Sequence, residues 1–244
     1  MNFNGRIIWS ADHLRPFELL EIIRNPDFPR DGVAVKLDRL FLTMYGLRII
    51  AEVQKLGVPV FADAKIVEIP SKTLEIAKVH LKYQPWMLNI MAGACNNGIT
   101  PSSPGNLTAD AMYQFAKLCE EAGTKPCIVT VLTSKTPELA TAEFGKTALQ
   151  TVEFYTKLAI DCGITDVVCS PQEANLVSTL GKIDINTPGV RLKDSSNDDQ
   201  ARVTTPYQAI KNGATRLVIG RDLSRDNAFA ENYAKIITNI EGGD

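Results

Sequence analysis

Two charged residues, Asp63 and Lys65, stand at the end of an apolar run that is typical of a buried strand. Residues two apart in a strand project from the same face, so these side chains are expected to lie next to each other. Burying a carboxylate and an ammonium group is costly unless they pair. The pattern indicates either a structural ion pair or a site where a lysine handles a proton, and the rest of the chain favours the site.

The charge pattern around Lys65 also indicates a type of chemistry. Carboxylates at Asp63 and Glu68 flank this lysine in the sequence and favour its protonated form. A protonated lysine is a poor base and a good general acid or electrostatic anchor. It suits a reaction in which negative charge develops on a substrate carbon and is then stabilised or protonated.

Eight short strand patterns alternate with amphipathic helical patterns along the whole chain. The expected strands are residues 7–11, 33–37, 58–65, 86–91, 127–132, 166–169, 183–186 and 216–220. No linker or change in composition separates them, which predicts an α/β fold: a single (β/α)8 TIM barrel domain over residues 1–244. An open doubly wound sheet is the second possibility, but no Gly-x-Gly-x-x-Gly turn follows the first strand.

Composition excludes several classes of function. The formal net charge is -2, with no long run of one sign, so no surface for nucleic acid is expected. No stretch approaches ~18 uninterrupted apolar residues, so no membrane span is expected. The five cysteines are scattered and form no Cys-x-x-Cys pair, which favours a reduced cytoplasm over a disulfide framework. No zinc motif is present, and we expect no metal.

Polar residues gather where a barrel of this type carries its active site, at the carboxyl ends of the strands. They are Asp12, Lys36, Asp63, Lys65, Ser134, Gln200, Gly220 and Arg221. Loops after the seventh and eighth strands frequently bind phosphate, and the Arg221 guanidinium suits phosphate oxygens. The long segment 188–203 has no periodic pattern and is either an active-site lid or a plain surface loop.

Six segments in this order carry a family resemblance. The first is Asp63-x-Lys65-x-x-Glu68 followed by Ile69-Pro70, and the others are residues 129–134, 167–174, 187–191, 199–206 and 218–221. With them, the chain resembles the orotidine 5'-phosphate decarboxylase family from Ile8 to about Ala230. The resemblance implies conversion of orotidine 5'-monophosphate to uridine 5'-monophosphate in pyrimidine biosynthesis, without metal or cofactor. It also implies a homodimer with the active site at the subunit interface.

The resemblance further implies a role for each matching residue. Lys65 would protonate C6 of the pyrimidine, and Asp63 would destabilise the substrate carboxylate. Lys36 would orient Asp63 and the ribose, and Asp12 would bind ribose hydroxyls. Glu68 would reach the neighbouring subunit's site. The remaining substrate-binding residues would be Ser134 at the pyrimidine ring, Gln200 and Arg221 at the phosphate, and Pro188 and Gly220.

Three positions depart from the family pattern: Glu68 replaces an Asp, Lys72 takes the place of a Thr, and Met91 stands where a His is common. Two other functions stay open. One is a Mg²⁺-dependent sugar-phosphate decarboxylase of the 3-keto-gulonate 6-phosphate type, and the other is a non-catalytic binder of nucleotide phosphates. The Ile69-Pro70 continuation favours decarboxylation of orotidine 5'-monophosphate over the sugar-phosphate reaction, and retention of the charged residues counts against a mere binder.

Overall fold

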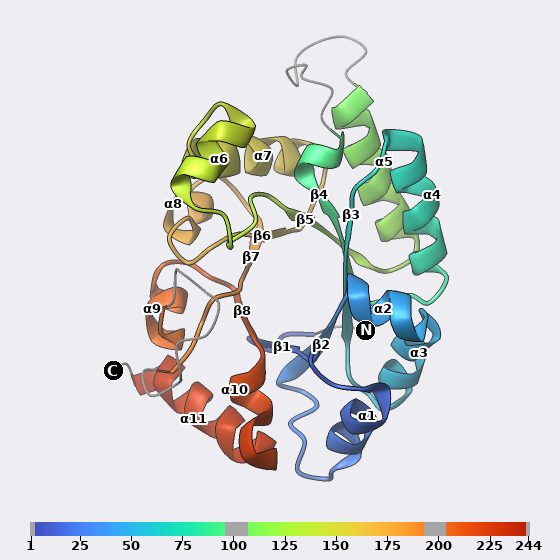
Figure 1. Cartoon of the computed structure of the whole chain (residues 1–244), viewed down its shortest axis with the longest axis vertical. Coiled ribbons are helices and arrows are strands. Elements are labelled where there is room, and N and C mark those ends of the chain that lie inside the picture. Colours follow the sequence, from blue (N-terminus) through green and yellow to red (C-terminus); the bar gives the residue numbers. More distant parts are fainter. Residues whose placement is uncertain (1–2, 96–106, 193–203, 243–244) are drawn as a thin grey trace.

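A computed structural model describes residues 3–95, 107–192 and 204–242 of the chain. Its strands form one closed barrel in which each strand pairs in parallel with its neighbours in the sequence, and β1 closes the ring by pairing with β8 (Figure 1). The strands are β1 (Ile7–Ser10), β2 (Val33–Asp38), β3 (Val60–Ile66), β4 (Met87–Met91), β5 (Lys125–Val129), β6 (Asp166–Val168), β7 (Asp184–Thr187) and β8 (Arg216–Ile219). The predicted TIM barrel is confirmed.

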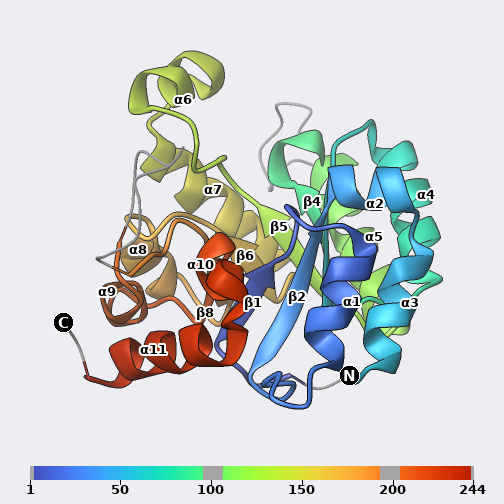
Figure 2. The ribbon, with the colours of Figure 1, turned by 60° about the horizontal axis from the view of Figure 1, so that its bottom comes forward.

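Helices surround the barrel and cover its outer face (Figures 1 and 2). They are α1 (Pro16–Arg24), α2 (Arg39–Tyr45), α3 (Arg48–Lys55), α4 (Pro70–Leu81), η1 (Ala92–Cys95), α5 (Leu107–Glu121), α6 (Pro137–Phe144), α7 (Ala148–Asp161), α8 (Ala174–Ser178), α9 (Pro206–Lys211), α10 (Arg221–Ser224), η2 (Arg225–Asn227) and α11 (Phe229–Gly242). In the described parts of the chain, no helix has the length and apolar character needed to cross a membrane.

Successive residues of a strand point alternately into two different apolar cores. Ile7 and Trp9 on β1 belong to the large core between the barrel and its helices, whereas Ile8 belongs to a smaller core that also contains Ala34 and Phe61. This second core fills the barrel interior, as the two-residue period of a strand requires. The residue two positions after an interior residue therefore also projects into the interior, closer to the carboxyl end of the barrel.

The observed strand limits differ from the expected ones by a few residues, and two differences bear on the site. β5 ends at Val129 although the apolar run continues, because Val131 and Leu132 leave the ladder and line a cavity. β3 pairs with β4 through Ala62↔Leu88 and then Ile66↔Ile90, so β3 advances by more residues than its partner. The extra length is a bulge that contains Asp63 and Lys65, and such bulges commonly re-aim side chains next to active sites.

Candidate functional site

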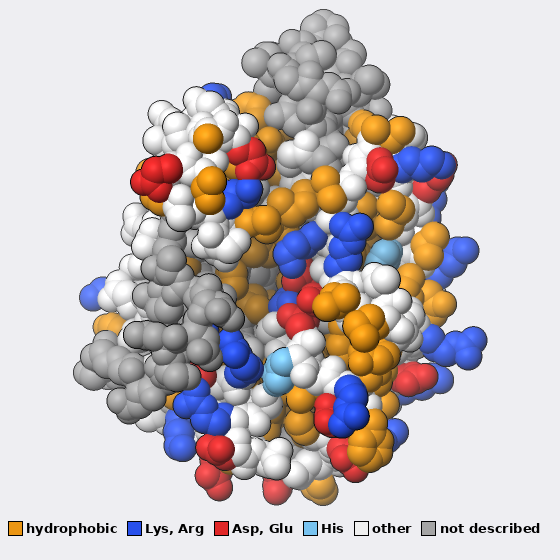
Figure 3. All heavy atoms as spheres, viewed as in Figure 1, with side chains coloured by type: hydrophobic (Ala, Val, Ile, Leu, Met, Phe, Trp, Pro, Cys, Tyr) orange, Lys and Arg blue, Asp and Glu red, His pale blue; other side chains and the backbone are white. Residues whose placement is uncertain are grey.

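A cavity of about 680 Å³ opens at the carboxyl ends of the strands. Of the residues expected there, it is lined by Asp12, Lys36, Asp63, Lys65, Pro188, Gly220 and Arg221. Figure 3 shows red and blue side chains together in the hollow at the centre of this face. Apolar side chains of Phe61, Val129 and Val168 line the same cavity, so it combines an apolar floor with charged walls.

Four charged side chains, from the turn after β1 and from β2 and β3, form a connected array in this cavity. The Lys36 ammonium pairs with both Asp12 and Asp63, and its Nζ lies 3.0 Å from Asp63 Oδ2. The Lys65 Nζ lies 2.6 Å from the same oxygen. Lys36 and Asp63 are buried, whereas the Lys65 side chain is 36% exposed toward the cavity. The expected contact between Asp63 and Lys65 is therefore present, and Lys65 is the more accessible of the two lysines.

The array keeps its two buried members charged. Burial alone would raise the pKa of Asp63, but the Lys36 and Lys65 ammonium groups outweigh it and hold that pKa well below the ordinary value. Burial alone would lower the pKa of Lys36, but the Asp63 and Asp12 carboxylates outweigh it and raise the pKa of that lysine. The cavity wall therefore presents a permanent negative charge between two lysines.

Asp12 is held in place by three donors. Ser10 Oγ donates to its Oδ2 at 2.6 Å, the Asp38 backbone N–H donates to its Oδ1 at 2.9 Å, and Lys36 donates to Oδ2. The carboxylate is nevertheless partly exposed to the cavity. A carboxylate fixed in this way can accept hydrogen bonds from the hydroxyls of a ligand.

Asn89 is a member of the site that the sequence reasoning missed, as it also missed Arg225 on the cavity wall. Asn89 is fully buried on β4, its Nδ2 donates to Asp63 Oδ1 at 2.7 Å, and its Oδ1 accepts the Lys65 backbone N–H at 2.7 Å. The signal was available, because Asn89 is a polar residue within the otherwise apolar strand 87–91, as Asp63 is in its own strand.

The opposite wall of the cavity comes from β8 and the segment after it. Gly220, Arg221, Ser224 and Arg225 line this wall, and His13 joins them from the loop after β1. The His13 Nε2 lies 2.8 Å from Ser224 Oγ. Burial, together with the nearby Arg221 guanidinium, lowers the pKa of His13. Two arginines at one end of a cavity, beside a glycine, can hold an anionic group such as a phosphate.

The other predicted site residues lie elsewhere. Ser134 is exposed on the loop before α6, beyond the described residues that line the cavity. Glu68 is exposed after the end of β3; its Oε2 accepts the Ile69 backbone N–H at 2.7 Å, and it lines a separate hollow with Leu42 and Ile76. Gln200 and most of the segment 188–203 lie outside the described residues.

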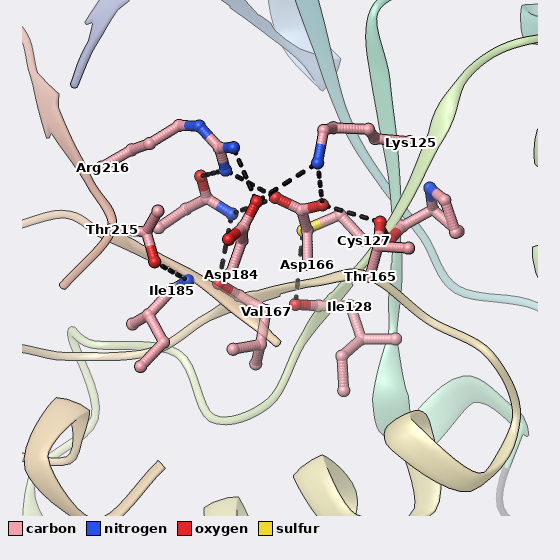
Figure 4. Close-up of polar contacts among 12 residues, drawn as sticks. Lys125, Cys127, Ile128, Thr165, Asp166, Val167, Asp184, Ile185, Thr215 and Arg216 are labelled. Carbon is pink, nitrogen blue, oxygen red and sulfur yellow. Dashed lines mark hydrogen bonds and ion pairs between the residues drawn. The ribbon is translucent and has the colours of Figure 1, made fainter. Parts of the chain in front are cut away.

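A second charged cluster lies at the other end of the barrel (Figure 4). Lys125, Asp166, Asp184 and Arg216 are the first residues of β5, β6, β7 and β8. Arg216 lies 2.8 Å from Asp166 and 2.7 Å from Asp184, and Lys125 lies 3.2 Å from each of these carboxylates. Because its two cations and two anions satisfy one another at the amino-terminal end, we interpret this cluster as a stabilising network.

Comparisons with known proteins show what the chain as a whole is similar to. A model of the orotidine 5'-phosphate decarboxylase / HUMPS family matches residues 5–236. The orotidine 5'-phosphate decarboxylase of Syntrophomonas wolfei is 30% identical, covering 99% of this chain and 100% of its own. That of Pseudoalteromonas translucida is 34% identical, covering 82% and 83%. The crystal structure of the Lactobacillus acidophilus orotidine 5'-phosphate decarboxylase shares the fold, with a TM-score of 0.75, 22% identity, and 97% and 99% of the two chains covered.

Proposed function

The chain belongs to the orotidine 5'-phosphate decarboxylase / HUMPS family, and we propose that it converts orotidine 5'-monophosphate to uridine 5'-monophosphate in pyrimidine biosynthesis. The observation that carries the proposal is the Asp63 carboxylate held between Lys36 and Lys65 on the cavity wall, at 3.0 Å and 2.6 Å from their ammonium groups. Such an array places a fixed negative charge next to a proton donor, which is what loss of a carboxylate followed by protonation of the carbon requires.

In the proposed reaction, the substrate carboxylate lies beside Asp63, and repulsion between the two anions is relieved when the bond from C6 to the carboxylate carbon breaks. Carbon dioxide leaves, and the electron pair stays on C6. Lys65 then transfers a proton from its ammonium group to C6 and recovers one from solvent. Lys36 keeps Asp63 ionised through these steps. The lysine is buried beside the aspartate, and its raised pKa keeps it protonated.

Binding of the rest of the substrate is proposed to follow the shape of the cavity. Arg221 and Gly220 hold the phosphate, Asp12 binds ribose hydroxyls, and the apolar floor with Pro188 receives the pyrimidine. Ser134 and Gln200 complete the proposed set of substrate-binding residues. Binding energy from the remote phosphate would then be used to bring the carboxylate against Asp63. The reaction as proposed uses no metal and no cofactor.

We also propose that two copies of the chain form a homodimer through the face beside Glu68. Large apolar side chains are exposed there, among them Leu40 and Met44 on α2 and Ile69 before α4, with exposures of 64%, 62% and 61%. Figure 3 shows hydrophobic side chains gathered over α2. An exposed apolar patch of this kind is typical of a protein interface. Glu68 lies at its edge and would reach the site of the second copy.

A cytoplasmic location and a single domain over residues 1–244 complete the proposal. The first is supported by four buried free thiols, at Cys119, Cys127, Cys162 and Cys169, which suit a reducing compartment. The second is supported by barrel strands that run from Ile7 to Ile219.

The test is the loss of orotidine 5'-monophosphate absorbance on addition of purified protein, with and without EDTA. We expect conversion to uridine 5'-monophosphate that EDTA does not slow. Conversion that EDTA abolishes would contradict the metal-free reaction and favour the Mg²⁺-dependent sugar-phosphate decarboxylases, for which 3-keto-gulonate 6-phosphate is the comparison substrate. Folded protein that binds the nucleotide without converting it would refute the proposed function.

A further inference from the structure

One buried amide joins the two reactive residues of the site. Asn89 lies on β4 opposite the bulge in β3, where the pairing passes from Ala62↔Leu88 to Ile66↔Ile90. Its side chain takes the place of the missing ladder contacts, because its Oδ1 accepts the Lys65 N–H and its Nδ2 donates to Asp63 Oδ1, both at 2.7 Å. A single side chain therefore contacts the backbone of the lysine and the carboxylate of the aspartate.

The backbone at Lys65 needs such a contact. Its φ is +42°, a left-handed conformation that non-glycine residues rarely adopt and that persists only where surrounding structure imposes it. The second contact also has a directional effect. With Oδ1 of Asp63 occupied by the Asn89 amide, Oδ2 is the oxygen that faces both Lys36 and Lys65.

We propose that Asn89 is a positioning residue for the reaction: its amide sets the direction of the Lys65 side chain through the backbone and the orientation of the Asp63 carboxylate. The expected effect of Asn89 on kcat rests on the proposed function. Asn89 itself is not among the described residues that line the cavity. Its effect acts through the geometry of two residues that do.

The barrel contains a matched control. Asn186 on β7 is also fully buried, and its Nδ2 donates to Asp166 Oδ1 on the preceding strand at 3.2 Å. This asparagine belongs to the charged cluster at the amino-terminal end, away from the cavity. Asn89→Ala and Asn186→Ala therefore remove the same buried amide, which in each case donates to an aspartate, and only the first should alter the reactive geometry.

The test compares kcat, KM and thermal stability of the two variants. A displacement of about 1 Å at reacting groups costs on the order of 10²-fold in rate. We expect Asn89→Ala to lower kcat by about that factor with KM little changed, and Asn186→Ala to lower the melting temperature while leaving kcat within about threefold of wild type. Equal losses of kcat in both variants, or a folded Asn89→Ala protein with unchanged kcat, would overturn the proposal.

Asn89→Asp supplies a second variant if the alanine protein does not fold. A neutral carboxylic acid has one donor and one acceptor and can replace the amide, whereas a carboxylate would repel Asp63. The ionisable groups around position 89 are Asp63 and Lys65 on β3, Lys36 behind them on β2, and the Cys127 thiol paired with it on β5, whose pKa burial raises. We expect kcat of this variant to rise as the pH falls and its added carboxyl group is protonated. A pH profile identical to that of wild type would contradict the proposal.

Hydrogen exchange separates this inference from the proposed function. The Lys65 amide should exchange faster in Asn89→Ala than in wild type or Asn186→Ala, because its acceptor is lost, whether or not the chain decarboxylates anything. Wild-type protein that does not turn over orotidine 5'-monophosphate would refute the proposed function alone. Unchanged exchange at Lys65 would refute the positioning role alone.

Discussion

Replacement of Lys36 by methionine removes the buried cation that two carboxylates share. The Nζ lies 3.0 Å from Asp63 Oδ2, which at an effective dielectric constant of about 20 corresponds to an attraction of ~5.5 kcal/mol. Part of this attraction offsets the cost of burying the lysine. Breaking such a buried pair by removing one partner costs ~3–5 kcal/mol. We therefore expect Lys36→Met to lower the free energy of unfolding by that amount, or the melting temperature by roughly 6–20 °C for a chain of this size.

The loss should depend on pH. In wild type the pKa of Asp63 is depressed, so this residue contributes stability that is present above its unfolded value of ~3.9 and is lost as the pH falls through the folded value. Without Lys36 the folded pKa rises, and this contribution shrinks. The difference in unfolding free energy between wild type and Lys36→Met should therefore be largest near neutral pH and should decrease in acid, as the pH falls through the raised folded pKa of Asp63 in the variant.

Urea unfolding of both proteins across this pH range is the assay. Lys157→Met is the matched control, because Lys157 pairs with Glu153 at 2.6 Å on the exposed face of α7, and exposed pairs contribute only ~0.2–1 kcal/mol. A loss in Lys36→Met no larger than that of the control would refute the electrostatic account of the array. So would a large loss that stays constant with pH.

Three further predictions concern turnover. Lys65→Ala should abolish uridine 5'-monophosphate formation with the circular dichroism spectrum unchanged, since the proton donor is gone; appreciable residual turnover would remove Lys65 from that role. Arg221→Ala should raise KM for the nucleotide and weaken binding of inorganic phosphate measured by calorimetry, because one cation of the phosphate end is lost; unchanged affinity would argue against this assignment. Glu68→Asp shortens the side chain by one methylene, and we expect a higher kcat if the longer acid handicaps the proposed shared site; an equal kcat would indicate that the site is adapted to Glu68.

The barrel and the heart of the site were predictable from local patterns. The two-residue period places Asp63 two positions beyond the interior Phe61, so the sequence alone indicated that this carboxylate and Lys65 point into the barrel at its carboxyl end. The same reasoning applied to Met87 and Asn89 would have identified the amide. It was missed because burying a neutral amide costs less than burying a charge, so Asn89 is a weaker signal in an apolar strand than the ion pair is.

Other features depend on contacts that no local pattern encodes. The bulge at Lys65 is defined by its register with β4, whose partner residue Asn89 is 24 positions away. The cluster at the amino-terminal end joins Asp166 to Arg216 across 50 positions. Glu68 follows the end of β3 at Ile66, so the strand period no longer determines its direction and it lies outside the cavity.

The most direct test of the central claim is the reaction of orotidine 5'-monophosphate with the protein in D₂O, followed by nuclear magnetic resonance of the product. Because Lys65 exchanges its ammonium protons with solvent before donating one, we predict uridine 5'-monophosphate with deuterium at C6 and one equivalent of carbon dioxide released. Recovery of unchanged orotidine 5'-monophosphate from folded protein would contradict the account.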